Sequence, residues 1–227
     1  MGASFRPRQL ALAFEHAESF AREDFLSGPS NETALALIER WPDWPNRAVV
    51  MVGPEGSGKS HLASIWAAEA GARSVSAHAL GQIDLPGALV TGALVVEDVA
   101  PDEMEERALF HLLNLAREQD ASLLLTAATA PSGWAVNIPD LASRLRALPV
   151  VTLAPPDDGM LRSVIVKLAA DRQLVVDETL VSYLMTRIER SFAAAREAVA
   201  RLDREAMRQH RPVTRALAVE LFGERSP

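Results

Sequence analysis

The sequence predicts an α/β fold in which a parallel sheet with flanking helices is followed by a region made only of helices. Short apolar runs alternate with segments of helical periodicity up to residue 153, which is typical of parallel strands joined by helices. After Ala154-Pro155-Pro156 no strand pattern recurs, and every segment has helical periodicity. We therefore expect an N-terminal tail over residues 1–24, an α/β region over 25–155 and a helical region over 156–227.

The elements of the α/β region follow from local signals. Ser30 or Asn31 is placed to cap a helix that runs through Ile38, and the prolines of residues 41–45 end that helix. Apolar runs predict buried strands at 48–53, 93–99, 122–126 and 150–153. Apolar residues at helical spacing predict helices at 59–70 and 102–119.

The helical region and the tail differ in their patterns. Helical periodicity predicts four C-terminal helices at 157–172, 177–188, 191–209 and 214–222. Residues 1–24 show no sustained periodicity, so we expect the start of the chain to be mobile.

Composition excludes several functional classes. The chain has 227 residues, enough for a sizeable core, and its 23 basic and 30 acidic side chains give a net charge of −7, which disfavours nucleic-acid binding through bulk charge. No cysteine is present, which excludes disulfides, thiolate catalysis and cysteine-bound zinc. No apolar run approaches about 18 residues, and the first residues lack the apolar segment of a signal peptide. We therefore expect a cytoplasmic protein with no membrane contact.

Residues 53–60, Gly-Pro-Glu-Gly-Ser-Gly-Lys-Ser, match the phosphate-binding pattern G-x-x-x-x-G-K-[ST] between a predicted strand and a predicted helix. The glycines allow successive N–H groups to face phosphate oxygens, and the helix N-terminus adds partial positive charge. Lys59 is then placed to contact the β- and γ-phosphates and Ser60 to ligate Mg²⁺. The chain has only two lysines, Lys59 and Lys167, against 21 arginines, so a lysine here indicates a requirement for an ammonium group.

Two acids end the predicted strand at 93–99. Its sequence, Leu-Val-Val-Glu-Asp over residues 94–98, is similar to the strand whose terminal carboxylates hold Mg²⁺ and orient the attacking water in nucleotide hydrolases. We expect Glu97 to face the metal, directly or through a coordinated water, with Asp98 beside it. The plain alternative is a strand that simply ends in two solvated carboxylates.

With these residues the chain resembles the DnaA-related AAA+ family, and in particular its short members that regulate the replication initiator. The resemblance covers nearly the whole chain. It rests on Phe25–Asn31 (FLSGPSN), the phosphate loop, Asp140–Leu145 (DLASRL) and the stretch around Arg190. It implies an AAA+ nucleotide-binding base of α/β type with a C-terminal helical lid, and ADP or ATP with Mg²⁺ as the bound cofactors.

The resemblance also implies roles for two arginines. Arg144, in DLASRL, matches the position of the arginine finger, which acts in trans on ATP held by a neighbouring protein. Arg190 matches the lid arginine that contacts the nucleotide in cis. Taken alone, either arginine is compatible with a surface ion pair. The implied nucleotide contacts are Leu26, Asn31, Pro54, Glu55, Gly56, Ser57, Gly58, Lys59, Ser60, His61 and Arg190.

Two departures from the family pattern predict slow nucleotide turnover. The family orders the strand-end acids as Asp and then Glu or Asp, whereas here Glu97 comes before Asp98. The segment that corresponds to sensor 1 is Leu124–Ala128, in which Thr126 is the only polar side chain. We therefore expect the protein to hold nucleotide better than it hydrolyses it.

Residues 9–14, Gln-Leu-Ala-Leu-Ala-Phe, resemble the hexapeptide by which bacterial proteins bind the DNA polymerase sliding clamp. In an extended peptide Gln9 would hydrogen-bond a polar spot, Leu10 would follow it, and Leu12 and Phe14 would enter an apolar pocket. Ordering such a tail costs entropy, so the affinity is modest. Taken alone, the pattern also fits an edge strand or a chance match.

The resemblance implies a regulatory protein that sits on the β subunit clamp of DNA polymerase III and stimulates hydrolysis of DnaA-bound ATP, which prevents re-initiation of chromosome replication. In this reading DNA is reached only through the loaded clamp, and the chain could form a homodimer. The alternative is a DNA-acting module of related fold, such as a helicase loader or a truncated initiator, which predicts salt-sensitive DNA binding by the isolated protein. A small-molecule kinase with a helical lid is a third class, but no feature marks an acceptor site.

Overall fold

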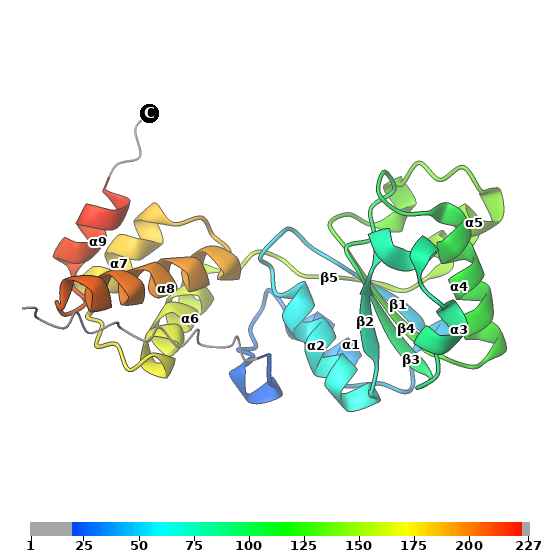
Figure 1. The fold of residues 1–227 in the computed structure, drawn as a ribbon, viewed down its shortest axis with the longest axis horizontal. Coiled ribbons are helices and arrows are strands. Elements are labelled where there is room, and N and C mark those ends of the chain that lie inside the picture. Colours follow the sequence, from blue (N-terminus) through cyan, green and yellow to red (C-terminus); the bar gives the residue numbers. More distant parts are fainter. Residues whose placement is uncertain (1–19, 224–227) are drawn as a thin grey trace, which may run out of the picture.

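The computed structural model describes residues 20–223 and has a five-stranded parallel sheet at the centre of the α/β region (Figure 1). The strands are β1 (Ala48–Val52), β2 (Arg73–Ser76), β3 (Ala93–Glu97), β4 (Ser122–Ala127) and β5 (Val150–Thr152). They lie in the order β2-β3-β4-β1-β5, and each neighbouring pair is parallel. The carboxyl ends of β3, β4 and β1 therefore lie side by side at one edge of the sheet.

Helices cover both faces of this sheet. One face carries α1 (Glu32–Ile38) and α2 (Lys59–Ala70), and the other carries α3 (Leu85–Ala88), α4 (Glu106–Glu118) and α5 (Pro139–Ala147) (Figure 1). Successive strand residues point to opposite faces, so Val50 of β1 joins one core and Met51 joins the other. Because both faces are covered, β1 and β4 are buried throughout, which explains the apolar sequence of β1 and the three consecutive leucines of β4.

The C-terminal region contains α6 (Asp158–Asp171), α7 (Glu178–Arg187), α8 (Phe192–Gln209) and α9 (Arg215–Phe222). These helices lie to one side of the sheet and enclose a hydrophobic cluster of their own (Figure 1). Each follows a residue whose side-chain oxygen accepts a hydrogen bond from a first-turn amide, which fixes where the helix begins. These capping residues are Asp157, Asp177, Ser191 and Thr214.

The structure confirms the predicted fold class, and the predicted strands and C-terminal helices agree with it to within two residues at each end. Strand β2 was not predicted, because this edge strand is polar and largely exposed. The helix predicted at 102–119 begins only at Glu106, since the backbone at 101–104 forms a turn in which the Glu103 and Met104 amides donate to the Ala100 carbonyl.

The predicted capping role of Asn31 is wrong in its chemistry. Asn31 occupies the position before α1, but its side chain gives the helix no hydrogen bond. Its Oδ1 accepts from the Gly28 amide at 2.9 Å and its Nδ2 donates to the Leu26 carbonyl at 2.9 Å. Asn31 therefore closes the turn that precedes the helix.

An aromatic cluster joins the first helix to the sheet. Trp66 is fully buried, and the Trp44 ring stacks on it with a centroid distance of 4.8 Å. Trp41 meets the same indole edge-on and donates its Nε1 hydrogen to Ser122 at 3.1 Å. Between residues 20 and 223 the structure has no helix that is both long and apolar enough to cross a membrane.

Candidate nucleotide-binding site

The predicted phosphate loop and the strand-end polar residues meet at the carboxyl edge of the sheet. The loop over residues 53–58 follows β1, Thr126 lies near the end of β4, and Glu97 ends β3. Since β3, β4 and β1 are neighbours in the sheet, the topology brings the loop, the hydroxyl and the acids to one place. Ligands of open parallel sheets bind at such carboxyl ends.

The loop over residues 53–58 has the backbone form of an anion cradle. Gly56 and Gly58 have φ angles of +70° and +99°, which residues with a Cβ adopt only with strain. Gly58 precedes α2 with no side-chain cap, so the first amides of this helix have no side-chain acceptor. The Ser57 hydroxyl is buried without a hydrogen-bond partner. The loop therefore presents unpaired donors at a helix N-terminus, where the helix dipole favours an anion.

Lys59 follows this loop as the first residue of α2. Its side chain is largely buried, and its Nζ donates to the carbonyl oxygens of Gly53 and Pro54 at 2.8 and 2.9 Å. Burial lowers the pKa of this ammonium, while the charges of Asp98 and Glu55 act in the opposite direction. The ammonium is thus held in the concavity by weak neutral acceptors that a phosphate oxygen can replace.

The two strand-end acids differ in position. Glu97 is half-buried as the last residue of β3, whereas Asp98 is exposed and has a left-handed backbone with φ of +57°. The Asp98 amide donates to the Thr126 hydroxyl at 3.0 Å, so the one polar side chain of the predicted sensor segment binds backbone. Of the two acids, Asp98 is the one whose charge acts on Lys59. No group of three metal-ligating side chains of the His, Cys, Asp and Glu types occurs within the described ranges.

The start of α8 contacts the phosphate loop directly. The Phe192 amide donates to the Gly56 carbonyl at 2.9 Å, and a Cβ at Gly56 would lie 2.7 Å from that of Ser191. The loop needs glycine here for its φ angle and also for this close approach. Arg190 immediately precedes this contact, but its side chain is exposed and pairs with Asp158 of α6 at 2.9 Å. Arg190 therefore lies two residues before a contact with the phosphate loop, but its guanidinium is paired with Asp158 and is not directed toward the loop.

The segment predicted to hold the adenine and ribose lies between the two regions. The Asn31 side chain fixes Leu26 through the 2.9 Å bond described above, and the Met160 sulfur of α6 lies 3.9 Å from the Asn31 amide nitrogen. On the α2 side, the His61 ring meets Phe25 edge-on with a centroid distance of 5.2 Å and lies 3.1 Å from the Ala21 carbonyl oxygen. Burial lowers the pKa of His61 below its ordinary 6.5, which favours the neutral imidazole. His61 therefore positions the segment, and its predicted contact with nucleotide stays a prediction.

Arg144 lies away from the phosphate loop, on α5. Its guanidinium carbon is 5.2 Å from the centroid of the Phe110 ring, which is the geometry of a cation–π contact. Its side chain lines a pocket together with Ala48 and Leu123, which lie at the starts of β1 and β4. The loop and Arg144 thus lie toward opposite edges of the sheet, and the predicted trans role of Arg144 stays a prediction. The predicted clamp-binding residues Gln9, Leu10, Leu12 and Phe14 lie outside the described residues.

Glu106, which sequence reasoning missed, fixes the start of α5. Its carboxylate accepts from the Asn137 amide at 2.8 Å, from the Asn137 side chain at 2.9 Å and from the Ile138 amide at 2.9 Å. These hydrogen bonds lower the pKa of Glu106 below its ordinary 4.5, and the bond from the Asn137 backbone amide has the largest effect. One carboxylate of α4 thereby sets the position of the helix that carries Arg144.

Acidification is expected to weaken this connection. Because the pKa of Glu106 is lower in the folded than in the unfolded chain, its stabilisation is present above about pH 4.5 and is lost as the pH falls through the folded value. Glu106→Gln removes the titrating charge, so its melting temperature should fall less than that of the wild type between about pH 5 and about pH 3, the range below the unfolded value in which the stabilisation is lost. Thermal melts monitored by circular dichroism measure this difference. Equal pH dependence in the two proteins contradicts the assignment.

No protein-family model matches the chain. An uncharacterized protein of Haemophilus influenzae is 25% identical over 223 residues, which cover 91% of this chain and 95% of that protein.

Several solved structures of known proteins are similar to this chain in fold. Domain III of the Thermotoga maritima replication initiation protein DnaA superposes with a TM-score of 0.75 at 18% identity, covering 90% of this chain and 95% of that one. AMPPCP-bound DnaA from Aquifex aeolicus gives 0.65 at 18% identity over 82% of this chain and 67% of that one. The Thermotoga maritima RuvB Holliday junction branch migration motor gives a TM-score of 0.66 at 16% identity, covering 89% of this chain and 70% of that one. The chain therefore has the fold of the AAA+ region that DnaA and RuvB share.

Proposed function

We propose that this chain is a nucleotide-binding AAA+ regulator similar to Hda. In this proposal the chain binds the sliding clamp through its residues 9–14 and presents its Arg144 to ATP bound by DnaA. The observation that carries the proposal is the separation of two sites on one sheet. A phosphate loop lies at the carboxyl edge, and an arginine without a carboxylate partner among the described residues lies near the opposite edge. One site suits nucleotide held in cis, and the other suits nucleotide held by a partner.

The residues at the carboxyl edge fit an adenine nucleotide with Mg²⁺. The unpaired Ser57 hydroxyl, the uncapped α2 N-terminus and the Lys59 ammonium are donors suited to phosphate oxygens. Ser60 is exposed in the first turn of α2, and the acids at the end of β3 face the same edge, so these oxygens could hold the metal. When bound, Mg²⁺ supplies charge neutralisation across the phosphates. The AMPPCP complex of the Aquifex aeolicus DnaA, which has the same fold, supports this ligand class.

Slow intrinsic hydrolysis fits the same geometry. Efficient hydrolysis needs a carboxylate or amide that orients the attacking water beside the γ-phosphate. Here the Thr126 hydroxyl accepts from the Asp98 amide, and the charge of Asp98 raises the pKa of Lys59. We infer that the site retains nucleotide, which holds the loop and the start of α8 together, and contributes little turnover.

In trans, Arg144 would stabilise the charge that develops on the transferred γ-phosphoryl group of DnaA-bound ATP. A guanidinium supplied by a second protein increases such hydrolysis by about 10³–10⁵-fold. Phe110 holds the Arg144 side chain over its ring, and Glu106 fixes the start of the same helix. These contacts pre-orient the cation before the partner arrives, which reduces the entropy lost on docking.

The test is hydrolysis of radiolabelled ATP prebound to DnaA, measured with and without this protein and with and without clamp loaded on DNA. We expect rapid conversion to DnaA-bound ADP only when both the protein and the loaded clamp are present. Unchanged hydrolysis in the complete mixture contradicts the proposal. Salt-sensitive binding of this protein to DNA without clamp would instead support the DNA-acting alternative. The similarity in fold to the RuvB branch migration motor is the observation that favours this alternative.

A further inference from the structure

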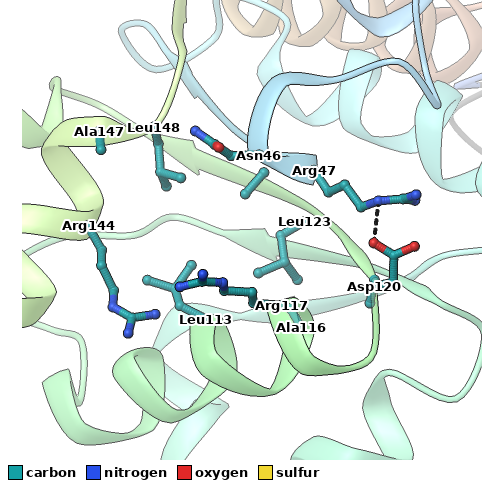
Figure 2. A pocket seen from close by; sticks show the side chains of 12 residues that line it. Asn46, Arg47, Leu113, Ala116, Arg117, Asp120, Leu123, Arg144, Ala147 and Leu148 are labelled. Carbon is teal, nitrogen blue, oxygen red and sulfur yellow. Dashed lines mark ion pairs between the residues drawn. The ribbon is translucent and has the colours of Figure 1, made fainter.

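A pocket of about 550 Å³ opens at the edge of the sheet opposite the phosphate loop (Figure 2). Its walls come from the starts of β1 and β4, the end of α4 and the end of α5, segments that are far apart in the sequence. The interior is apolar, with Leu113, Leu123 and Leu148, and the rim carries the polar side chains. Concave sites of this size with an apolar floor and a few convergent polar groups are typical of ligand sites.

The rim of this pocket has excess positive charge. It carries Arg47, Arg117 and Arg144 against a single acid, Asp120. Asp120 forms an ion pair with Arg47 at 2.6 Å, and both are drawn to the far side of the pocket (Figure 2). Over the described part of the chain, neither Arg117 nor Arg144 pairs with a carboxylate. Figure 2 shows their side chains directed toward the same space, so two like charges converge there.

The backbone beside the pocket is strained. Asn46 and Arg47 are consecutive non-glycine residues with φ of +55° and +51°. Left-handed backbone costs an L-residue about 1–2 kcal/mol, and such strain is found at ligand sites more often than elsewhere. In this conformation Arg47 pairs with Asp120, and both Asn46 and Arg47 line the pocket.

We propose that this pocket binds a phosphate group through the paired guanidiniums of Arg117 and Arg144. A phosphate monoester carries about −1.5 to −2 charges at pH 7, which balances two arginines, whereas one carboxylate balances only one. The planar guanidinium also matches phosphate oxygens two at a time. The apolar floor accommodates the body that carries the phosphate. The bearer is either a small molecule free in solution or the nucleotide held by a partner, and the second case rests on the proposed function.

The direct test follows the arginine Nε–H NMR signals of Arg117 and Arg144, assigned with Arg→Lys variants, during titration with pyrophosphate. These signals report on the pocket itself, so phosphate bound at the loop does not obscure the result. We expect both signals to shift with one saturation curve. Arg117→Ala should weaken the titration of the Arg144 signal at least about tenfold. Arg146→Ala is the matched control, because Arg146 is exposed on the same helix, donates its Nε to the Ala142 carbonyl and does not line the pocket.

The second arm identifies the bearer. If the phosphate belongs to a partner's nucleotide, Arg117→Ala should lower the stimulation of DnaA-bound ATP hydrolysis at least tenfold, while Arg146→Ala leaves it unchanged. If the bearer is a free molecule, pyrophosphate shifts both signals although Arg117→Ala stimulates hydrolysis normally. Absence of stimulation by the wild type, with the pyrophosphate titration intact, contradicts the proposed function and leaves the pocket assigned. Signals that stay unmoved by pyrophosphate but shift with a glutamate-rich peptide overturn the pocket proposal.

Discussion

Arg144→Ala is expected to abolish stimulation of DnaA-bound ATP hydrolysis, with a loss of about 10³–10⁵-fold in the presence of loaded clamp. The guanidinium is the group that neutralises charge in the transition state, and alanine leaves nothing in its place. The measurement is the first-order rate of conversion of DnaA-bound ATP to ADP. The loss should appear in this rate and not in binding to the clamp, because the proposed clamp-binding residues 9–14 are far from α5 in the sequence.

The structure allows two controls for this variant. Arg146→Ala removes the same charge from the same helix, two residues on, where the side chain donates its Nε hydrogen to the Ala142 carbonyl of its own helix. It should stimulate hydrolysis like the wild type. Phe110→Leu removes the ring under the Arg144 guanidinium but keeps the cation, so partial activity is expected. Full activity of Arg144→Ala, or equal losses in Arg144→Ala and Arg146→Ala, contradicts the assignment.

Most of the fold could be predicted because its signals are local. Strands β1 and β4 are buried on both faces, so β1 is wholly apolar and β4 has three consecutive leucines. The C-terminal helices were predicted from their helical periodicity, and in the structure each follows a side chain that caps it. Strand β2 lacked any such signal, since its Arg73, Ser74 and Ser76 are exposed and only pairing with β3 makes it a strand.

The site was predictable where a contiguous motif carries it and not where distant segments build it. Lys59 follows from its pattern alone, and its burial within the loop agrees with that reading. The orientation of Arg190 toward Asp158 depends on α6, and the role of Glu106 depends on the Asn137 and Ile138 amides thirty residues on. Such contacts leave no periodicity or spacing for a sequence to show.

The pocket around Arg117 shows the same limit more strongly. Arg117 is one of the 21 arginines of the chain. It lies in the last turn of an amphipathic helix, where the helix dipole stabilises a cation whatever its function. Only the pairing of β1 with β4 and the return of the chain through α5 bring Arg144 beside it. The positive charge around the pocket therefore results from the chain topology. It could not be inferred from the net charge of the chain, which is −7.

Lys59→Met is expected to weaken binding of ADP and ATP by about 10- to 150-fold, which corresponds to the about 1.5–3 kcal/mol of a hydrogen bond to a charged group. Methionine keeps the length of the side chain but has no donor for the phosphates. It also removes the bonds to the Gly53 and Pro54 carbonyls, so a melting curve must accompany the titration. Isothermal titration calorimetry with Mg²⁺ present measures the dissociation constants.

Lys167→Met is the matched control, since it removes the other lysine of the chain, which lies on α6 and pairs with Asp24 and Asp171. Its nucleotide affinity should equal that of the wild type. Arg144→Ala should also bind nucleotide normally, because Arg144 lies at the opposite edge of the sheet from the loop. If Lys59→Met binds ADP as tightly as the wild type, the loop at residues 53–60 is not the nucleotide site. If Arg144→Ala loses its own nucleotide, the two edges act as one site and the trans role of Arg144 fails with it.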